Sequence, residues 1–290
     1  MIICNNQLDN NQLKAVHDLT MLCREQDGGT PTLYDHLLVQ KRPTDNNVLY
    51  FQEGQLIGFL SVYFFYEDAC EVSVLVAPAH RRQGIARQLL RNILPLLIAK
   101  DMKNLIFSNP ATINETWLTK LGFTYRNSEY HMHRISYEPI LIPTPKLSMR
   151  KAVLEDIPTL CAIDAACFAE PQENMTRRFD LLLNDSDYIL LLALYKEIIV
   201  GKAHIHWQPK SAIFSDIAIL PQHQRQGWGG EMLAHCINQA LAFGKSMLTL
   251  DVETSNRNAL NLYLRNGFKT VNVSDYWVIP LQKLVYDWAI

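Results

Sequence analysis

The chain has 290 residues, 48% of them hydrophobic, and its 27 basic and 29 acidic residues leave a formal net charge of −2. This length fits two ordinary domains, and the near-neutral charge argues against a nucleic-acid partner or an anionic-membrane surface. No uncharged apolar run reaches the ~18 residues of a membrane span. The chain begins MIICNN, without a basic stretch before an apolar one, so we expect no signal peptide and a cytoplasmic protein.

The hydrophobic pattern of the first half predicts a mixed α/β domain. We expect helices over 11–26 and 31–40, followed by strands over 47–51, 55–66 and 71–76. The third of these strands is apolar almost throughout, which is typical of a strand buried on both faces. After it, the pattern predicts a helix over 84–98, a strand over 104–107, a short helix near 113–120, and strands over 123–127 and 130–135.

The second half repeats this order of elements. Helices are expected over 155–168, 172–184, 228–243 and 256–266, and strands over 187–195, 198–207, 212–220 and 247–252, with two closing strands within 268–280. Three prolines within 139–145 favour an extended connector between the halves. We therefore expect two domains, 1–143 and 144–290.

One sequence motif occurs once in each half. Residues 72–86 (VSVLVAPAHRRQGIA) match residues 215–229 (SDIAILPQHQRQGWG), so that Gly84 and Gly227 lie 143 residues apart. A second match, Gly-Phe at Gly122 and again at Gly267, has an offset of 145 residues. Two landmarks at nearly one spacing indicate a duplicated domain.

The repeated motif combines an apolar strand, a proline, a basic turn and a glycine that begins a helix. Glycine lets a ligand approach the backbone, and the first helical turn offers unpaired N–H groups with partial positive charge. Such a turn binds a phosphate or pyrophosphate well, and Arg225 adds a full charge at its rim. In the first half, Arg81 and Arg82 supply the charge, and Ala86 replaces the last glycine.

Both turns resemble the pyrophosphate loop of the GCN5-related N-acetyltransferase (GNAT) superfamily, Gln/Arg-x-x-Gly-x-Gly/Ala. Residues 256–268 (NRNALNLYLRNGF) also resemble that superfamily's downstream signature. The resemblance implies two tandem α/β domains, each with a mixed sheet whose central strands separate to admit the acyl-CoA. It implies acetyl-CoA as the donor, an amine as the acceptor, and cofactor contacts at Val74, Val76, Arg81, Arg82, Gln83, Gly84, Ile85, Ala86, Ile217, Ile219, Gln224, Arg225, Gln226, Gly227, Trp228, Gly229, Gly230 and Asn256.

The second half offers an acid for the leaving thiolate. Tyr263 lies where many members of the superfamily hold a tyrosine near the sulfur of CoA. A phenol, with a pKa of about 10, stays protonated at neutral pH and can donate to a developing thiolate. In the first half Leu118 takes this position, and leucine has no proton to donate. We therefore expect a non-catalytic first half, which either binds acyl-CoA without turnover or serves as a scaffold.

Three carboxylates are candidates for the base that deprotonates the amine. Asp251 comes first, because the region resembles ribosomal-protein N-terminal alanine acetyltransferases, which place a Glu base there. Asp216, on the neighbouring strand, and Glu253, on the same strand as Asp251, are the alternatives. The main-chain N–H of Ile219 is the expected donor to the oxyanion.

We expect no metal, because the pairs His131/His133 and His204/His206 have no third ligand at a suitable spacing. The expected function is direct acetyl transfer from acetyl-CoA to a primary amine, on a small molecule or a protein N-terminus. A non-catalytic acyl-CoA sensor and a transferase for a different acyl group are the alternatives. The chain is expected to act as a monomer or a homodimer.

Overall fold

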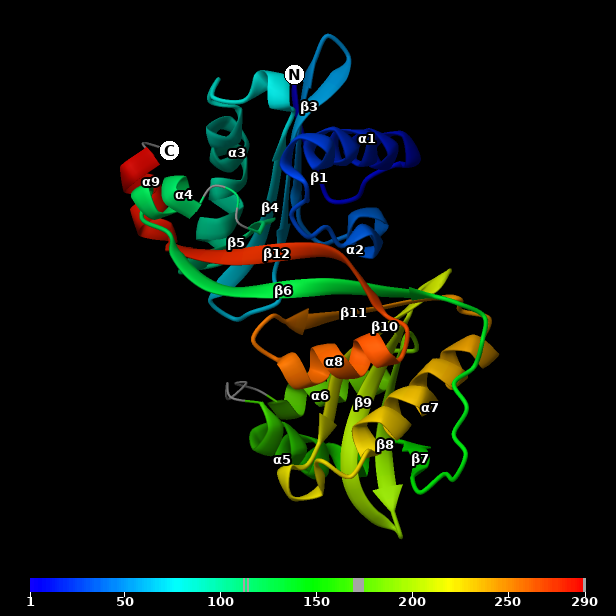
Figure 1. Ribbon diagram of the computed structural model, residues 1–290. Helices are drawn as coiled ribbons and strands as arrows, with labels where there is room; N and C mark the ends of the chain where they lie inside the picture. The colour runs from blue at the N-terminus through cyan, green and yellow to red at the C-terminus, as the bar shows by residue number, and fades with distance from the viewer. Residues whose placement is uncertain (112, 114, 169–174, 289–290) are drawn as a thin grey trace. The chain divides into compact units, whose positions relative to one another are not determined.

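The computed structural model describes residues 1–111, 113, 115–168 and 175–288. The chain forms two compact units (Figure 1), and we call Met1–Tyr130 with Asn272–Ile290 the first unit and His131–Val271 the second unit. This division differs from the expected domains 1–143 and 144–290. It differs because the end of the chain joins the first unit, where it supplies a strand of the sheet.

The first unit has a sheet in the order β1-β2-β3-β4-β5-β12, with β6 beside β12. Helix α1 packs on one face of this sheet and α3 on the other (Figure 1). The bounds are β1 Ile2–Asn5, α1 Asn10–Asp27, α2 Asp35–Val39, β2 Asn47–Gln52, β3 Gln55–Tyr63, β4 Ala69–Val76, α3 Ile85–Ala99, β5 Asn104–Pro110, α4 Glu115–Lys120, β6 Thr124–Ile135, β12 Lys269–Pro280 and α9 Leu281–Trp288.

The C-terminal strand completes the core of the first unit. Strand β12 pairs antiparallel with β5 from Ser274–Pro110 to Pro280–Asn104. Four apolar side chains are buried in the same cluster as side chains of α1, α3 and β2–β5. Two belong to β12, Trp277 and Ile279, and two to α9, Leu281 and Leu284. The expectation of two closing strands within 268–280 is therefore wrong. The expectation of a break between 127 and 130 is also wrong, because β6 is continuous. Neither segment has a glycine or proline before its last residue that would turn the chain.

The second unit has a sheet in the order β6-β11-β10-β9-β8-β7. Helices α5 and α6 pack together on one face, where Leu160, Ile163 and Phe179 meet side chains of β8 and β10. Helix α7 packs against β9 and β10. The bounds are β7 Ser148–Lys151, α5 Ile157–Cys167, α6 Met175–Asn184, β8 Tyr188–Tyr195, β9 Ile198–Trp207, β10 Ser211–Ile219, α7 Trp228–Ala242, β11 Met247–Glu253 and α8 Arg257–Arg265.

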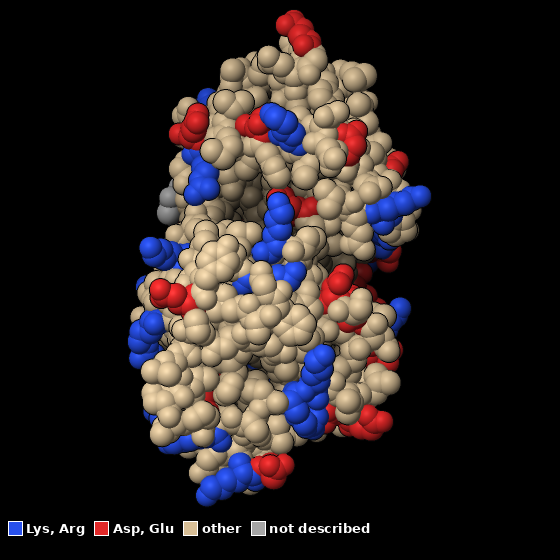
Figure 2. All heavy atoms as spheres, turned by 90° about the vertical axis from the view of Figure 1, so that its right-hand side faces the viewer, with Lys and Arg blue, Asp and Glu red and all other residues tan. Residues whose placement is uncertain are grey.

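The helix expected over 31–40 is shorter than expected, Asp35–Val39, because the backbone at Thr32 bonds to Ser108 and Ser73 instead. The other expected elements have counterparts at nearly the expected bounds, while β1, β7 and α9 are additional. Position 114 of the first short helix and positions 172–174 of the helix expected over 172–184 lie outside the described residues. In the part of the chain that the structure describes, no helix is long and apolar enough to cross a bilayer. Basic and acidic side chains are interspersed on the face shown in Figure 2.

Candidate active site

A β-bulge distinguishes the central strand of the second unit from its counterpart in the first. Strands β9 and β10 pair at His204–Ser215 and again at Lys202–Ala218, so three steps along β10 face two steps along β9. The additional residue lies at Asp216, whose φ of 49° is in the left-handed region. In the first unit, β3 and β4 pair from Tyr63–Glu71 to Gly58–Val76 without any shift. Bulges end regular pairing and often occur beside active sites.

Strands β10 and β11 separate next to this bulge. Their parallel pairing runs from Ser211–Met247 to Phe214–Leu250 and stops there. The Leu220 N–H donates to the Val200 carbonyl on the β9 side. Because N–H directions alternate along a strand, the N–H groups of Ile219 and Ile217 face the β11 side, beyond the last pair. The gap therefore has main-chain donors along one edge.

A glycine of β9 allows the bulged strand to lie close. A Cβ atom on Gly201 would sit 2.4 Å from the main-chain oxygen of Ala218. Backbone cannot yield as a flexible side chain can, so only glycine fits here.

The loop after β10 has the form of an anion site. Gly227 begins α7 with a φ of 83°, and no side chain caps the helix. Arg225 has a φ of 61°, and its side chain is exposed. The Gln224 side chain donates to the Ile219 carbonyl at 2.9 Å, which ties the loop to the end of β10. The uncapped N–H groups of the first helical turn fit a pyrophosphate.

Some expected cofactor contacts have structural roles as well. The Trp228 side chain is buried against the rings of Tyr195 and His223, so this residue can offer only its main chain to a cofactor. The Asn256 side chain caps α8 by accepting from the Ala259 N–H at 3.1 Å. Gly229 and Gly230 face Leu262 of α8 and leave space for its side chain.

The loop of the first unit has the same backbone but a different charge balance. Gly84 begins α3 with a φ of 81°, again without a side-chain cap, and Arg82 has a φ of 60°. The Arg81 guanidinium, however, donates to both carboxylate oxygens of Asp27 at 2.7 Å. One of the two arginines is therefore already neutralised, and Ile85 is buried like Trp228.

Tyr263 lies on α8 and is almost buried, with 7% of its surface exposed. Its ring meets Phe268 edge-on, and Phe268 in turn meets Phe214 of β10. Burial raises the pKa of Tyr263 to about 12, and the nearby Cys236 acts in the same direction. The phenol is thus firmly protonated at neutral pH.

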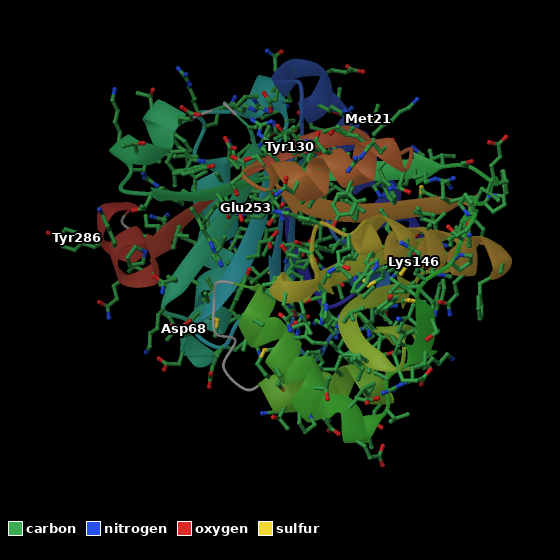
Figure 3. The ribbon with its side chains drawn as sticks, turned by 60° about the horizontal axis from the view of Figure 1, so that its bottom comes forward. Met21, Asp68, Tyr130, Lys146, Glu253 and Tyr286 are labelled. Atoms are coloured by element: carbon green, nitrogen blue, oxygen red, sulfur yellow. The ribbon has the colours of Figure 1, made fainter. Side chains whose placement is uncertain are left out.

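Asp251 lies one residue beyond the last β10–β11 pair, and the His131 imidazole contacts its carboxylate. The distance between His131 Nδ1 and Asp251 Oδ1 is 2.5 Å, and the Asp251 side chain is 47% exposed. Leu250 shares the face of its partner Phe214, so alternation directs Asp251 to the opposite face of the sheet. Glu253 ends β11 and is exposed (labelled in Figure 3).

Asp216 belongs to an ionic network with α5, α6 and β9. Its partners are the Arg178 guanidinium, at 3.1 Å from both carboxylate oxygens, and His204 Nδ1 at 3.2 Å. Behind them, Lys202 Nζ lies 2.5 Å from Asp164. The sequence prediction included Asp216 and considered His204 as half of a pair without a third metal ligand, and it missed Asp164, Arg178 and Lys202. A lysine in the middle of an apolar strand was the available signal.

The first unit lacks these groups. By strand pairing, Phe59 and Ser61 stand where the second unit has Lys202 and His204, and Ser108 stands at the position of Asp251. Leu118 is buried at the position of Tyr263. Glu71 is buried elsewhere on β4, where it accepts from the Tyr34 hydroxyl.

A segment of the first unit covers the point where β4 and β5 end their pairing. The Thr32 N–H donates to Ser108 Oγ at 2.7 Å, and Ser73 Oγ donates to the Thr32 carbonyl at 2.5 Å. Asn272 of β12 binds both main-chain groups of Thr30. The serines at this point are therefore engaged with the chain's own backbone.

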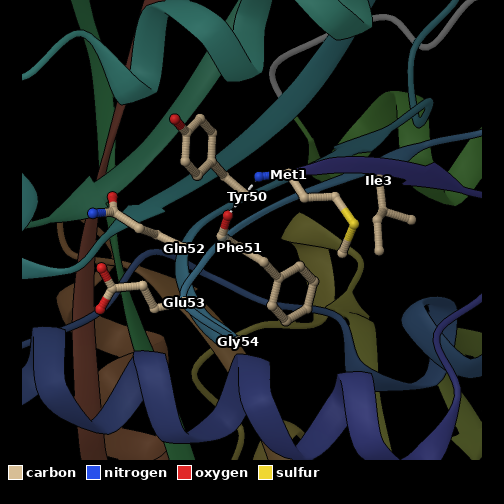
Figure 4. A pocket seen from close by; sticks show the side chains of 7 residues that line it. All are labelled: Met1, Ile3, Tyr50, Phe51, Gln52, Glu53 and Gly54. Atoms are coloured by element: carbon tan, nitrogen blue, oxygen red, sulfur yellow. Dashed lines mark hydrogen bonds between the residues drawn. The ribbon is translucent and has the colours of Figure 1, made fainter.

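Two further observations concern ligands. Among the described residues, no three His, Cys, Asp or Glu side chains are grouped to hold a metal ion. A shallow depression at the β2–β3 hairpin is lined by Met1, Ile3 and residues 50–54, with the terminal ammonium bonded to the Phe51 carbonyl (Figure 4). None of the predicted site residues lies in it.

Comparison with known proteins agrees with this geometry. The model of the acetyltransferase (GNAT) family matches twice, over residues 13–123 and 154–268. No curated protein matches the sequence. A GCN5-related N-acetyltransferase from Sphaerobacter thermophilus has a similar structure, with a TM-score of 0.76, 15% identity, and coverage of 96% of this chain and 95% of that one. A tandem GNAT protein from the clavulanic acid biosynthesis pathway has a TM-score of 0.63, 14% identity, and coverage of 97% and 98%. The chain belongs to the acetyltransferase (GNAT) family and is a tandem member of it.

Proposed function

We propose that this protein transfers an acetyl group directly from acetyl-CoA to a primary amine, and that the reaction takes place in the second half of the chain. The family supports acyl transfer from an acyl-CoA. The gap beside the bulge of β10 supports the proposal that the reaction takes place in the second half. There, main-chain donors face the β11 side, and a carboxylate lies one residue beyond the last strand pair.

The loop at 224–229 binds the pyrophosphate of acetyl-CoA in this proposal. The uncapped N–H groups of α7 and the exposed Arg225 favour the anion. The strand edge at Ile217 and Ile219 then accepts the pantetheine arm, and the Ile219 N–H donates to the thioester oxygen. Negative charge that develops on this oxygen in the transition state is stabilised by such a fixed donor.

Asp251 is the proposed base. It takes a proton from the acceptor ammonium, directly or through a water, while His131 holds its carboxylate. The neutral nitrogen attacks the thioester carbon, the new C–N bond forms, and the C–S bond breaks. The second proton of the nitrogen passes to the leaving sulfur, so that the products are an amide and the free CoA thiol. Glu253 lies farther along β11, at its exposed end, and is the second choice.

Tyr263 is the proposed donor to the leaving sulfur. A thiol has a pKa of about 8.5, so a phenol with a pKa of about 12 does not give up its proton completely to a free thiolate. The phenol instead stabilises the developing charge through a hydrogen bond. A hydrogen bond to a charged group contributes roughly 1.5–3 kcal/mol, which corresponds to about 10- to 100-fold in rate.

The first half is proposed to bind or scaffold without catalysis. Its β4 has no bulge, and its counterparts of Asp251 and Tyr263 are a serine and a leucine. Segment 30–34 occupies the point where β4 and β5 part.

The test is the release of free CoA thiol from acetyl-CoA in the presence of a panel of primary amines, with the N-acetylated product identified by mass. Wild type should release thiol, and Tyr263→Phe should lower turnover about 10- to 100-fold with acetyl-CoA affinity unchanged. Tyr63→Phe, a buried tyrosine of the first unit, is the control and should match wild type. Acetyl-CoA binding without thiol release for any amine would favour the sensor alternative.

A further inference from the structure

The second unit buries two full charges and a histidine beside the bulge. Lys202 is 0% exposed, Asp164 is 3% exposed and His204 is 1% exposed. Asp164 lies on α5, and Lys202 and His204 lie on β9. The rings of Phe168 and Phe179 each lie against the Nζ atom of Lys202. Burying charge is costly unless it is paired, so an arrangement of this kind indicates a role beyond packing.

The contacts within the network fix the direction of each hydrogen bond. Lys202 Nζ lies 2.5 Å from Asp164 and 3.3 Å from Nε2 of His204. An ammonium can only donate, so Nε2 accepts and Nδ1 carries the proton that His204 donates to Asp216. Burial lowers the pKa of His204 and outweighs the opposing effect of Asp216, so the imidazole stays neutral.

Asp216 is held on several sides. His204 and the Arg178 guanidinium together make three contacts of 3.1–3.2 Å with its carboxylate, and Lys202 Nζ lies 4.0 Å away. A carboxylate accepts about four hydrogen bonds, so most of its capacity is used by the protein. Burial alone would raise the pKa of Asp216, but the hydrogen bond from His204 and the surrounding positive charges outweigh it and lower the pKa. An anion held so firmly is a poor base.

The backbone at Asp216 needs such support. A left-handed φ in a residue other than glycine costs of order 1–2 kcal/mol. Side-chain contacts from α6 and β9 offset this cost and keep the bulge in place, and Asp164 of α5 pairs with Lys202 behind them. In the first unit β4 has no bulge, and Phe59 and Ser61 replace the lysine and the histidine.

We propose that Asp164, Arg178, Lys202 and His204 are positioning residues that act through Asp216: they anchor the bulge of β10 to α5, α6 and β9, and so hold the strand amides toward the gap beside β11. The inference rests on the proposed function, because those amides are the ones assigned to the thioester oxygen. It gives Asp216 the role of an anchor and leaves the role of base to Asp251.

Three substitutions at Asp216 separate an anchor from a base. Asp216→Asn keeps hydrogen-bond acceptance and tolerates a left-handed backbone, Asp216→Gly keeps only the backbone freedom, and Asp216→Ala keeps neither. An anchor predicts that Asn keeps kcat within about 3-fold of wild type, that Ala loses at least about 10-fold, and that Gly lies between them. A base predicts that all three lose activity alike, because none can accept the proton.

A spectroscopic readout does not depend on the acceptor. The carbonyl stretch of bound acetyl-CoA, labelled with ¹³C at the thioester carbon, should lie at lower frequency than in free acetyl-CoA when a strand amide donates to it. The shift should be retained in Asp216→Asn and lost in Asp216→Ala. Asp164→Asn with Lys202→Met, a pair that keeps the buried charge balanced, should also reduce it. Arg150→Met with Asp156→Asn removes a different ion pair of the second unit and is the matched control.

The outcomes separate this inference from the proposed function. Failure to bind acetyl-CoA at all in wild type would overturn both. A shifted carbonyl that persists in Asp216→Ala and in the Asp164/Lys202 double variant, with circular dichroism like wild type, would overturn the anchoring role alone. Equal loss of kcat in Ala, Gly and Asn with an unchanged carbonyl shift would return Asp216 to the role of base.

Discussion

At the scale of single residues, the protonation of Tyr263 has a measurable effect on stability. Its pKa in the folded protein is about 12, against about 10 in an unfolded chain. The raised pKa means that its contribution to folding is fully present below pH 10 and is lost as the pH rises toward 12. In that window the unfolded chain loses the proton first, so unfolding becomes more favourable.

We therefore expect the stability difference between wild type and Tyr263→Phe to shrink by about 1 kcal/mol for each pH unit above 10. Urea unfolding at pH 8.5, 10 and 11 measures it. Tyr286→Phe, which removes an exposed phenol, is the control for the substitution itself. A constant difference for Tyr263→Phe over this range would contradict the burial of this phenol.

The place of a residue in a local pattern was predictable, whereas contacts between residues far apart in the sequence were not. Gly227 follows an apolar strand and precedes an amphipathic helix, and that context alone indicates an anion-binding turn. Lys202 and Asp164 are 38 positions apart and meet only because α5 packs on β9. Nothing local to either residue reveals its partner.

At the scale of elements, the two glycines at the start of α7, Gly227 and Gly229, differ in what a side chain at each position would do. Gly227 has a φ of 83°, and a Cβ there would meet nothing within 4 Å, so substitution strains the backbone without a clash. Gly229 lies within the helix, where a Cβ would make ordinary contact with Leu262 at 3.6 Å. We propose that the first glycine is needed for the fold of the turn, and the second for the approach of a ligand.

Gly227→Ala should accordingly destabilise the protein by about 1–2 kcal/mol. Gly229→Ala should leave stability unchanged or raise it by up to about 1 kcal/mol. It should weaken acetyl-CoA binding, because the added methyl group would stand between Leu262 and Ile219, beside the strand edge assigned to the pantetheine arm. Urea unfolding and calorimetric titration measure the two effects. If Gly229→Ala bound acetyl-CoA as wild type does, the pantetheine arm would not lie beside this glycine.

The bulge of β10 was hidden at this scale. Comparing the two repeats at a constant offset of 143 places Asp216 opposite Ser73 and conceals the additional residue. Only the pairing register, His204–Ser215 followed by Lys202–Ala218, reveals it. The lengths of β6 and β12 were missed for a similar reason. The alternation of apolar and polar residues that predicts a strand does not show whether a segment forms one long strand or two short ones that follow each other.

At the scale of the whole molecule, the two repeats of the sequence are not the two compact units. The first unit needs residues 272–290, because four large apolar side chains of that segment are buried in its core. Each contributes roughly 1.5–3 kcal/mol, and their sum is comparable to the whole stability of an ordinary domain.

We expect a fragment of residues 1–143 not to fold cooperatively. A protein in which a flexible linker of ~15 residues joins residues 1–130 to 272–290 should fold, because the seven residue pairs between β5 and β12 are then restored. Near-ultraviolet circular dichroism and thermal unfolding of the two proteins measure this. Equal, sharp unfolding transitions in both would show that β12 is dispensable for the first unit.

Acetyl transfer in the second half of the chain can be tested by the rate of thiol release in Gly84→Glu and Gly227→Glu, with the best amine of the panel. Each glutamate places a negative side chain at the start of its helix, where the phosphate would bind, and circular dichroism checks that each variant is folded. We predict that Gly84→Glu keeps the wild-type rate and that Gly227→Glu loses it. Loss of the rate in Gly84→Glu with activity retained in Gly227→Glu would place the reaction in the first half instead.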